Sequence, residues 1–148
     1  MLKEVVELIL GVGHDICDSL RIENTLEIYG ERFTMRCFTG NERKKCDKRL
    51  KRAASYAKRF AAKEAFSKAL GTGMRQGVFW KNIEILNCPS GKPYLKLTGG
   101  AKKMLNSMLP PHTKPIIKLS ISDDSNLAYA MVIIEAVNLA STKTKSNN

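Results

Sequence analysis

The sequence predicts one α+β domain, with a single long helix packed on a mainly antiparallel sheet. Three observations support this class. Residues 48–70 form one helical pattern, rich in Ala, Lys and Arg, with no Pro or Gly inside it. Segments 82–86 and 93–97 flank the turn sequence Ser90-Gly91-Lys92, which is typical of an antiparallel hairpin. The chain's 148 residues suit one domain with its own core, and the sequence contains no internal repeat or linker.

Segment 8–16 is apolar and rich in glycine, which is typical of a strand that runs into a turn. Alternation puts Gly11, Gly13 and Asp15 on one face of this strand and His14 on the other. Asp15 therefore lies on a face with almost no side-chain bulk beside it. Taken alone, an Asp at this place is more often a turn residue or a helix cap than a metal ligand.

Residues 18–37 are predicted to be helical, with Asp18 or Ser19 as the N-cap. Gly30 divides this segment into two pieces. Gly71, just past the long helix, is well placed as the residue that ends a helix in the left-handed conformation.

The C-terminal third is predicted to contain one short helix and two strands. The helix is expected at 101–108, before two prolines. Segment 116–122 alternates as a strand with one apolar face, whereas 128–134 is continuously apolar, which predicts a strand buried on both faces. The chain ends in polar residues, so we expect the domain to span 1–138 and the segment 139–148 to be a disordered tail.

The chain is strongly basic, with 25 Lys and Arg against 14 Asp and Glu and a formal net charge of +11. Such a surface attracts anionic partners: nucleic acid, an acidic protein, a phosphorylated small molecule or an anionic membrane. A nucleic-acid-binding domain would place aromatic residues between the basic ones on one face. Here the basic residues are spread over the predicted helices without such a pattern, so no nucleic-acid partner is expected and that class is the weaker alternative.

The cysteines Cys17, Cys37, Cys46 and Cys88 contain no C-x-x-C pair, and free thiols in the reducing cytoplasm are their expected state. Lys3 and its acidic neighbours make the first residues a poor signal peptide. No run approaches the roughly 20 apolar residues that a membrane span needs. The expected location is therefore cytoplasmic, with no membrane partner.

The long helix contains the sequence Arg59-Phe60-Ala61-Ala62-Lys63-Glu64-Ala65-Phe66-Ser67-Lys68-Ala69-Leu70-Gly71-Thr72-Gly73. Glu64 and Lys68 are one helical turn apart and share a face. Ala57, Ala61 and Ala65 form a stripe of small residues, which predicts that this helix approaches a sheet closely. The alternative to a functional site is a solvated ion pair, worth roughly 0.3–0.5 kcal/mol to a helix. The turn after the helix either ends it or lines a ligand. Because a helix C-terminus is the negative end of the dipole, a phosphate there would need lysines or a metal.

Asp15 and Glu64 are the two candidate metal ligands. Mg²⁺ takes oxygen ligands, commonly one or two carboxylates together with substrate phosphates and water. The two carboxylates suit that ion if the fold brings them together, which sequence spacing does not show.

Four segments, in this order, resemble the bacterial holo-acyl-carrier-protein synthases. They are the G-x-G-x-D-I strand at 11–16, the R-F-A-A-K-E-A-F-x-K-A-L-G-T-G helix at 59–73, the G-K-P-Y hairpin at 91–94 and the S-I-S strand at 120–122. The resemblance covers roughly residues 9–136. The helix motif is highly specific, and four ordered motifs are hard to obtain by chance. The resemblance implies the 4′-phosphopantetheinyl transferase fold.

The resemblance also implies an activity. The 4′-phosphopantetheine group of coenzyme A would be transferred to a serine of an apo acyl carrier protein, with Mg²⁺, in fatty acid biosynthesis, releasing 3′,5′-ADP. By motif, Asp15 and Glu64 would bind Mg²⁺, and Lys68 would pair with a phosphate oxygen, so Glu64 and Lys68 are the implied catalytic residues. The base for the serine proton is either Glu64 or a metal-bound water that it orients, and both options stay open.

Substrate contacts are implied in the same way. Those to coenzyme A would come from Lys63, Lys68, Gly71, Thr72, Gly73, Gly91, Lys92 and Pro93. Those to the acidic carrier protein would come from Arg21, Arg32, Phe33 and Arg36. Arginines would steer the encounter, whereas Phe33 either anchors the partner or packs in the core. The Gly91-Lys92-Pro93 segment is at the least a hairpin turn. Relatives form homotrimers with each site across a subunit boundary, so a homotrimer is expected here.

One departure from the family pattern stands out. Many relatives continue S-I-S with His and Thr, whereas this chain has Asp123-Asp124. Asp123 either replaces the contacts of that His, adds to the acidic group near the metal, or caps the turn before the last strand, and the last is the expected role. An inactive scaffold is the second alternative function, and the intact metal and phosphate residues argue against it.

Overall fold

The computed structural model describes residues 7–139, and most of the expected tail, 140–148, lies outside them. In chain order the elements are β1 (Glu7–Asp18), α1 (Ser19–Tyr29), α2 (Glu31–Cys37), α3 (Gly40–Asp47), α4 (Arg52–Leu70), the 3₁₀ helix η1 (Trp80–Asn82), β2 (Ile83–Asn87), β3 (Pro93–Leu97), α5 (Gly99–Met108), β4 (Thr113–Asp124) and β5 (Leu127–Asn138).

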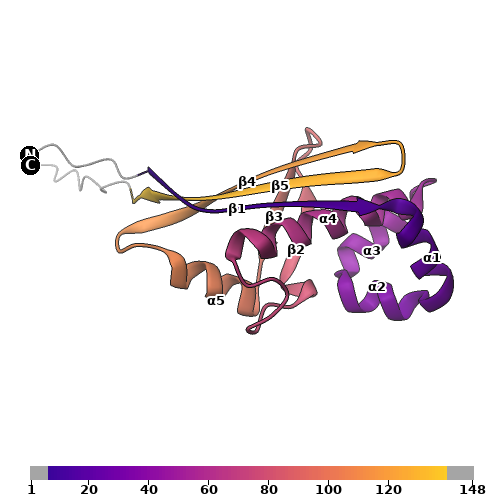
Figure 1. The fold of residues 1–148 in the computed structure, drawn as a ribbon, viewed down its shortest axis with the longest axis horizontal. Helices are drawn as coiled ribbons and strands as arrows, with labels where there is room; N and C mark the ends of the chain where they lie inside the picture. Colours follow the sequence, from indigo (N-terminus) through magenta and orange to yellow (C-terminus); the bar gives the residue numbers. More distant parts are fainter. Residues whose placement is uncertain (1–6, 140–148) are drawn as a thin grey trace, which may run out of the picture.

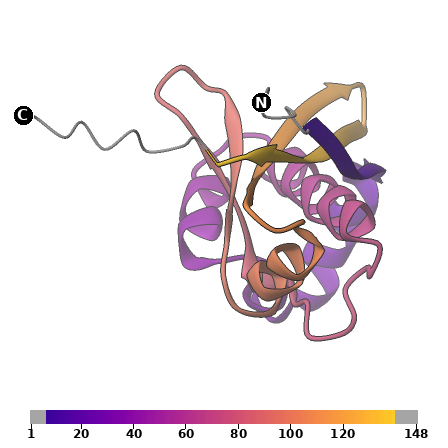
Figure 2. The same cartoon turned by 90° about the vertical axis from the view of Figure 1, so that its left-hand side faces the viewer.

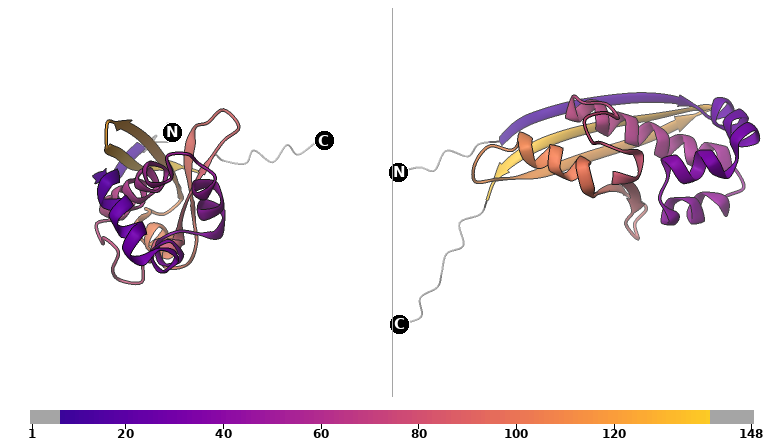
Figure 3. Two further views of the ribbon diagram at one scale, coloured as in Figure 1. Left: turned by 90° about the vertical axis from the view of Figure 1, so that its right-hand side faces the viewer. Right: turned by 90° about the horizontal axis from the view of Figure 1, so that it is seen from below.

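The strands form two antiparallel sheets. One has three strands in the order β1-β5-β4, and the other is the β2–β3 hairpin. The long strands make one elongated layer with α4 along it, while α1, α2 and α3 gather at one end of α4 and α5 lies toward the other (Figures 1 and 3). Seen end-on, the hairpin projects beside the three-stranded sheet (Figure 2). The predicted α+β class is therefore confirmed.

The long helix approaches β1 at backbone distance, because glycines on β1 face small residues on α4. A Cβ placed on Gly13 would lie 1.8 Å from the carbonyl oxygen of Ala65, and one on Gly11 would lie 1.9 Å from that of Ala69. Ala57, Ala61 and Ala65 of α4 are fully buried. The predicted stripe of small residues thus packs helix against sheet, and it fixes how β1 lies along α4.

The helix ends follow the sequence predictions. The Asp18 carboxylate accepts a hydrogen bond from the Leu20 N–H at 2.9 Å and caps α1. Gly30, at φ 52°, separates α1 from α2. Gly71 ends α4 at φ 79°, a left-handed conformation that suits a residue without Cβ.

The predicted start of the long helix is wrong. The helix begins at Arg52 rather than at 48, and a separate helix, α3, precedes it. A capping box nucleates α3: the Thr39 hydroxyl accepts from the Glu42 N–H, and the Glu42 carboxylate accepts from the Thr39 N–H. Because α3 is mostly charged, it has no apolar period to reveal it, and the Thr-x-x-Glu spacing is its only clear signal.

The prediction that 128–134 is buried on both faces is also wrong. Along β5, burial alternates: Ala130, Val132 and Ile134 are buried beneath α4, whereas Met131 is 45% exposed. The cause is that α4 covers only one face of the three-stranded sheet. The other face of β5 carries apolar residues that this chain does not cover by itself.

Within residues 7–139, no helix combines the length and apolar character needed to cross a membrane. The four cysteines are free, and all except Cys88 are buried.

Candidate active site

The centre of the candidate site is an ion pair between β1 and α4. Lys68 Nζ lies 2.8 Å from Asp15 Oδ1, although the two residues are 53 positions apart, and it also donates to the His14 carbonyl at 3.0 Å. The close approach of β1 and α4 at Gly13 brings them together, because Asp15 follows Gly13 on the same face of the strand. The Asp15 side chain is 15% exposed and that of Lys68 is 50% exposed, so the lysine is the more accessible member of this pair.

Glu64 is the second carboxylate of the site, one helical turn before Lys68 and half-buried. Burial, and then the negative charge of Asp15, raise the pKa of Glu64, while Lys68 and Arg21 oppose that shift. The two carboxylates are therefore close enough to repel each other. A cation between or beside them would relieve this repulsion.

The donor set fits a hard divalent cation that shares its ligands with a substrate. Asp15 and Glu64 supply carboxylate oxygens, and no group of three or more His, Cys, Asp or Glu in the described part of the chain could hold a metal ion. A zinc-type site made wholly of protein ligands is therefore not formed by these residues. Two carboxylates, completed by phosphate oxygens and water, are a common arrangement for Mg²⁺.

An aromatic groove lies between α1, α2 and η1. Phe60, one turn before Glu64, stacks on Trp80 with ring centroids 4.6 Å apart, and Phe33 contacts Phe60 at 6.3 Å. The aromatic groove has a volume of about 530 Å³ and is lined by Thr25, Tyr29, Arg32, Phe33, Arg36, Cys37 and Trp80. Three of the four residues expected to bind the carrier protein thus line one surface. The fourth, Arg21, is exposed on α1 and acts electrostatically on Glu64.

Phe33 fits both readings that the sequence left open. It is half-buried, and its ring packs edge-on against Phe38 at 5.8 Å between centroids. The same residue also lines the aromatic groove. Phe33 therefore joins the core to an accessible surface.

A second groove, of about 840 Å³, lies at the N-terminal half of α4 and is strongly basic. Its charged lining residues are Lys45, Arg49, Lys51, Lys58, Arg59 and Asp123. Arg59 is only 7% exposed, and its Nε has no hydrogen-bond partner among the described residues. Burial and the neighbouring Arg59 and Arg49 lower the pKa of Lys45. This basic groove therefore holds more positive charge than its own carboxylate balances, which favours an anion.

The two glycine-containing turns that were expected to contact coenzyme A lie near different ends of α4. Gly91 and Pro93 line the basic groove, whereas Lys92 beside them is exposed. The Gly71-Thr72-Gly73 turn directly follows α4, beyond Lys68, with open space around both glycines. Glu64 and Lys68 lie between these two ends.

Lys63 lies in surroundings that differ from those expected of a coenzyme contact. Its side chain is fully buried, and its ammonium group donates to Glu42, to the Cys37 carbonyl and to the Trp80 carbonyl. These three acceptors use all three ammonium protons. Burial lowers the pKa of Lys63, while the Glu42 carboxylate opposes that shift. In this structure Lys63 is therefore not free to bind coenzyme A.

Asp123 does not take the expected role of a turn cap. It lies within β4, and its Oδ1 is 3.7 Å from Lys58 Nζ, so its side chain faces the basic groove. It does not extend the Asp15–Glu64 pair, because no acidic group of three is formed among residues 7–139. Sequence reasoning also missed the cations of the basic groove. The run of basic residues between 43 and 52 was the available signal.

Comparisons with known proteins agree with this geometry. A family model described as the 4′-phosphopantetheinyl transferase superfamily matches residues 11–128, a range that includes every site residue described above. A holo-[acyl-carrier-protein] synthase of Methylorubrum populi is 57% identical over 133 residues, which cover 90% of this chain and 98% of that protein.

Solved structures give the same result. A holo-[acyl-carrier-protein] synthase from Neisseria meningitidis is similar with a TM-score of 0.76 at 35% identity, covering 86% of this chain and 98% of that one. Another, from Bacillus anthracis and in complex with CoA (3′,5′-ADP), has a TM-score of 0.68 at 36% identity, covering 86% of this chain and 96% of that one.

Proposed function

Because this chain belongs to the 4′-phosphopantetheinyl transferase superfamily, we propose that it transfers 4′-phosphopantetheine from coenzyme A to a serine of an apo acyl carrier protein. The transfer depends on Mg²⁺, releases 3′,5′-ADP and serves fatty acid biosynthesis. One feature supports this function most: β1 and α4 bring two carboxylates and a lysine together beside an open surface.

Asp15 and Glu64 would hold Mg²⁺, with the pyrophosphate of coenzyme A and water as its other ligands. The ion would neutralise the charge that grows on the phosphate groups during transfer. With Asp15 given to the metal, Lys68 would pair with a phosphate oxygen instead, which its half-exposed side chain permits.

In the chemical step, one phosphorus–oxygen bond forms and another breaks. The serine oxygen of the carrier protein attacks the β-phosphorus of coenzyme A, and the bond from that phosphorus to the bridging oxygen breaks. The electron pair leaves with 3′,5′-ADP. Glu64 takes the serine proton directly or orients a water that takes it. Lys68 stabilises the charge on the departing phosphate.

The basic groove would take the 3′-phosphate end of coenzyme A. Its buried Arg59 has an unsatisfied Nε, and Gly91 and Pro93 border the same space. The other end of the coenzyme would run past Glu64 toward the Gly71-Thr72-Gly73 turn. In this arrangement Arg59, and not Lys63, is the buried cation that contacts the coenzyme.

The carrier protein would dock on the aromatic groove and on Arg21. Arginines at the rim attract an acidic partner over long range, and the aromatic residues give it an apolar anchor. Arg21→Glu should raise the KM for the carrier protein roughly tenfold while the KM for coenzyme A changes little. Equal effects on both KM values would contradict this docking surface.

A homotrimer, with each site at a subunit boundary, fits the uncovered face of the sheet. Val12 and Ile16 of β1 and Met131 of β5 lie on the face opposite α4 and are each about half exposed, and such apolar patches are typical of interfaces. We take residues 1–138 as the functional domain. Free cysteines suit a reducing compartment, so the cytoplasm is the proposed location.

Intact-mass spectrometry tests the function directly. An apo acyl carrier protein incubated with this enzyme, coenzyme A and Mg²⁺ should gain the mass of one phosphopantetheine group, and EDTA should prevent the gain. No gain with several carrier proteins would favour the inactive-scaffold alternative, and Asp123 would be the first residue to change.

A further inference from the structure

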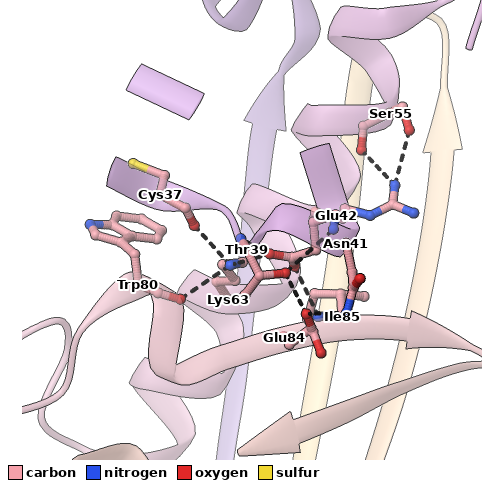
Figure 4. A network of polar contacts seen from close by, with 10 residues as sticks. Cys37, Thr39, Asn41, Glu42, Ser55, Lys63, Trp80, Glu84 and Ile85 are labelled. Carbon is pink, nitrogen blue, oxygen red and sulfur yellow. Dashed lines mark hydrogen bonds and ion pairs between the residues drawn. The ribbon is translucent and has the colours of Figure 1, made fainter. Parts of the chain in front are cut away.

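A fully buried ion pair joins Lys63 of α4 to Glu42 of α3 (Figure 4). Lys63 Nζ is 2.7 Å from Glu42 Oε2, 2.8 Å from the Cys37 carbonyl oxygen and 3.1 Å from that of Trp80. Neither charged side chain has any exposed area. Lys63 therefore joins α4 to α3, to the end of α2 and to η1.

The Glu42 carboxylate is satisfied on both oxygens. Its Oε1 accepts the Ile85 N–H of β2 at 2.9 Å, and its Oε2 accepts the Thr39 N–H at 2.8 Å as well as Lys63. Glu42 therefore extends the connection to β2 and to the start of α3. Five segments meet at one ion pair.

These contacts fix the rotation of α4 about its own axis. On the side facing β1, the buried contacts are made by alanines and glycines and are close but not directional, and among residues 7–139 the only hydrogen bonds between α4 and β1 come from the half-exposed Lys68 side chain. The Lys63 hydrogen bonds are directional and act on a different side. Glu64 is the next residue, about 100° further round the helix. Any rotation that releases Lys63 therefore also moves Glu64.

A small rotation would matter for the chemistry. The Glu64 carboxylate lies at the outer radius of the helix, about 6 Å from its axis, so a rotation of about 10° would move it by about 1 Å. A displacement of that size in a catalytic group can cost roughly 100-fold in rate.

We propose that Lys63 and Glu42 are positioning residues, which hold α4 in the rotation that directs Glu64 and Lys68 toward Asp15. This inference rests on the proposed function for the identity of the reaction. A buried ion pair adds little net stability compared with apolar side chains of the same size. Orientation of the helix is therefore a better account of this pair than stability alone.

The test combines kinetics with direct measurement of metal binding. Glu42→Asp keeps the charge but shortens the side chain, and Lys63→Met removes the charge. Both should lower kcat by roughly 10- to 100-fold at a temperature where circular dichroism shows them folded, with KM for both substrates changed less than about threefold. Calorimetry of Mg²⁺ binding in the presence of coenzyme A should show a dissociation constant raised about tenfold.

Tyr56→Phe is the matched control. Tyr56 is also fully buried on α4 and also ties α4 to α3, through a hydrogen bond from its hydroxyl to Asp47 at 2.8 Å, but it does not flank Glu64. This variant should lower Tm while leaving kcat and Mg²⁺ affinity unchanged.

Several outcomes would overturn the inference. One is wild-type kcat and Mg²⁺ affinity in folded Glu42→Asp, and another is an equal loss of kcat in Tyr56→Phe. If Lys63→Met does not fold, Glu42→Asp decides alone. If the wild-type chain makes no product, the proposed transfer fails, and the calorimetric comparison of Glu42→Asp with wild type still decides whether this pair positions the carboxylates.

Discussion

Lys63 and Lys68 lie five residues apart on α4, yet the structure places them in opposite environments. Lys63 is completely buried and surrounded by three acceptors, whereas the Lys68 side chain is 50% exposed and pairs with a carboxylate at the surface. One side of the helix holds it in place and the adjacent side carries the chemistry. Residues of one type within one sequence motif can thus serve two separate purposes.

The largest expected effect is a loss of kcat when Glu64, on the catalytic side of α4, is changed. Glu64→Gln keeps the shape of the side chain but removes a charge that would bind the metal, so kcat should fall by roughly 100- to 1,000-fold. Single-turnover assays at saturating Mg²⁺ measure this loss. Glu27→Gln, on an exposed part of α1 outside both grooves, is the control and should retain full activity. Near-normal turnover of Glu64→Gln would refute the metal assignment.

The sequence predicted the helix that carries both lysines but not their environments. Its alanine stripe and the Gly71 stop are local features, and both were confirmed. Whether a lysine in the motif is buried depends on which distant segments pack against it. The partner of Lys63 comes from α3, a helix that sequence periodicity did not reveal. A motif shared with a family shows which residues are present, but it does not show which of them are buried.

The site itself was predictable in part. Alternation along β1 correctly put Asp15 on the face of the two glycines, and this face is the one that meets α4. The contact between Asp15 and Lys68 spans 53 residues, so it could be known only from the fold. The apolar run in β5 led to the wrong prediction of burial on both faces, because apolar composition does not distinguish a face covered by α4 from an uncovered one.

The buried and exposed sides of α4 should differ in how much each lysine contributes to stability. Lys63→Met leaves a buried Glu42 without its partner and should lower the free energy of unfolding by about 3–5 kcal/mol. Lys68→Met removes an exposed pair and should change it by about 1 kcal/mol or less. Urea unfolding followed by circular dichroism measures both. Equal losses in the two variants would mean that the buried and exposed sides of α4 are not energetically distinct.

A third prediction concerns the contact of α4 with β1. The added Cβ in Gly13→Ala would overlap the Ala65 carbonyl, at 1.8 Å, so the two backbones must move apart. We expect a loss of about 1–3 kcal/mol in unfolding free energy, together with weaker Mg²⁺ binding because Asp15 moves with β1. Gly40→Ala is the control: its nearest neighbour is an arginine side-chain atom at 3.9 Å, so it should be neutral or slightly stabilising. Equal stability of the two variants would contradict the close approach.

The smallest expected effect is a pH-dependent difference in Tm between Glu64→Gln and wild type, which separates the contribution of Glu64 to stability from its contribution to function. Burial and the charge of Asp15 raise the pKa of Glu64 in the folded chain, so the folded state binds this proton more tightly than the unfolded state does. Between the ordinary and the raised pKa the unfolded chain holds fewer protons, and stability therefore falls as pH rises. Glutamine does not titrate. In EDTA, the Tm of Glu64→Gln should therefore rise relative to wild type as pH increases through this window, and the two should converge below it. A Tm difference that does not change with pH would show that the Glu64 charge costs the fold nothing. The expected result is that the residue most needed for turnover slightly destabilises the metal-free protein.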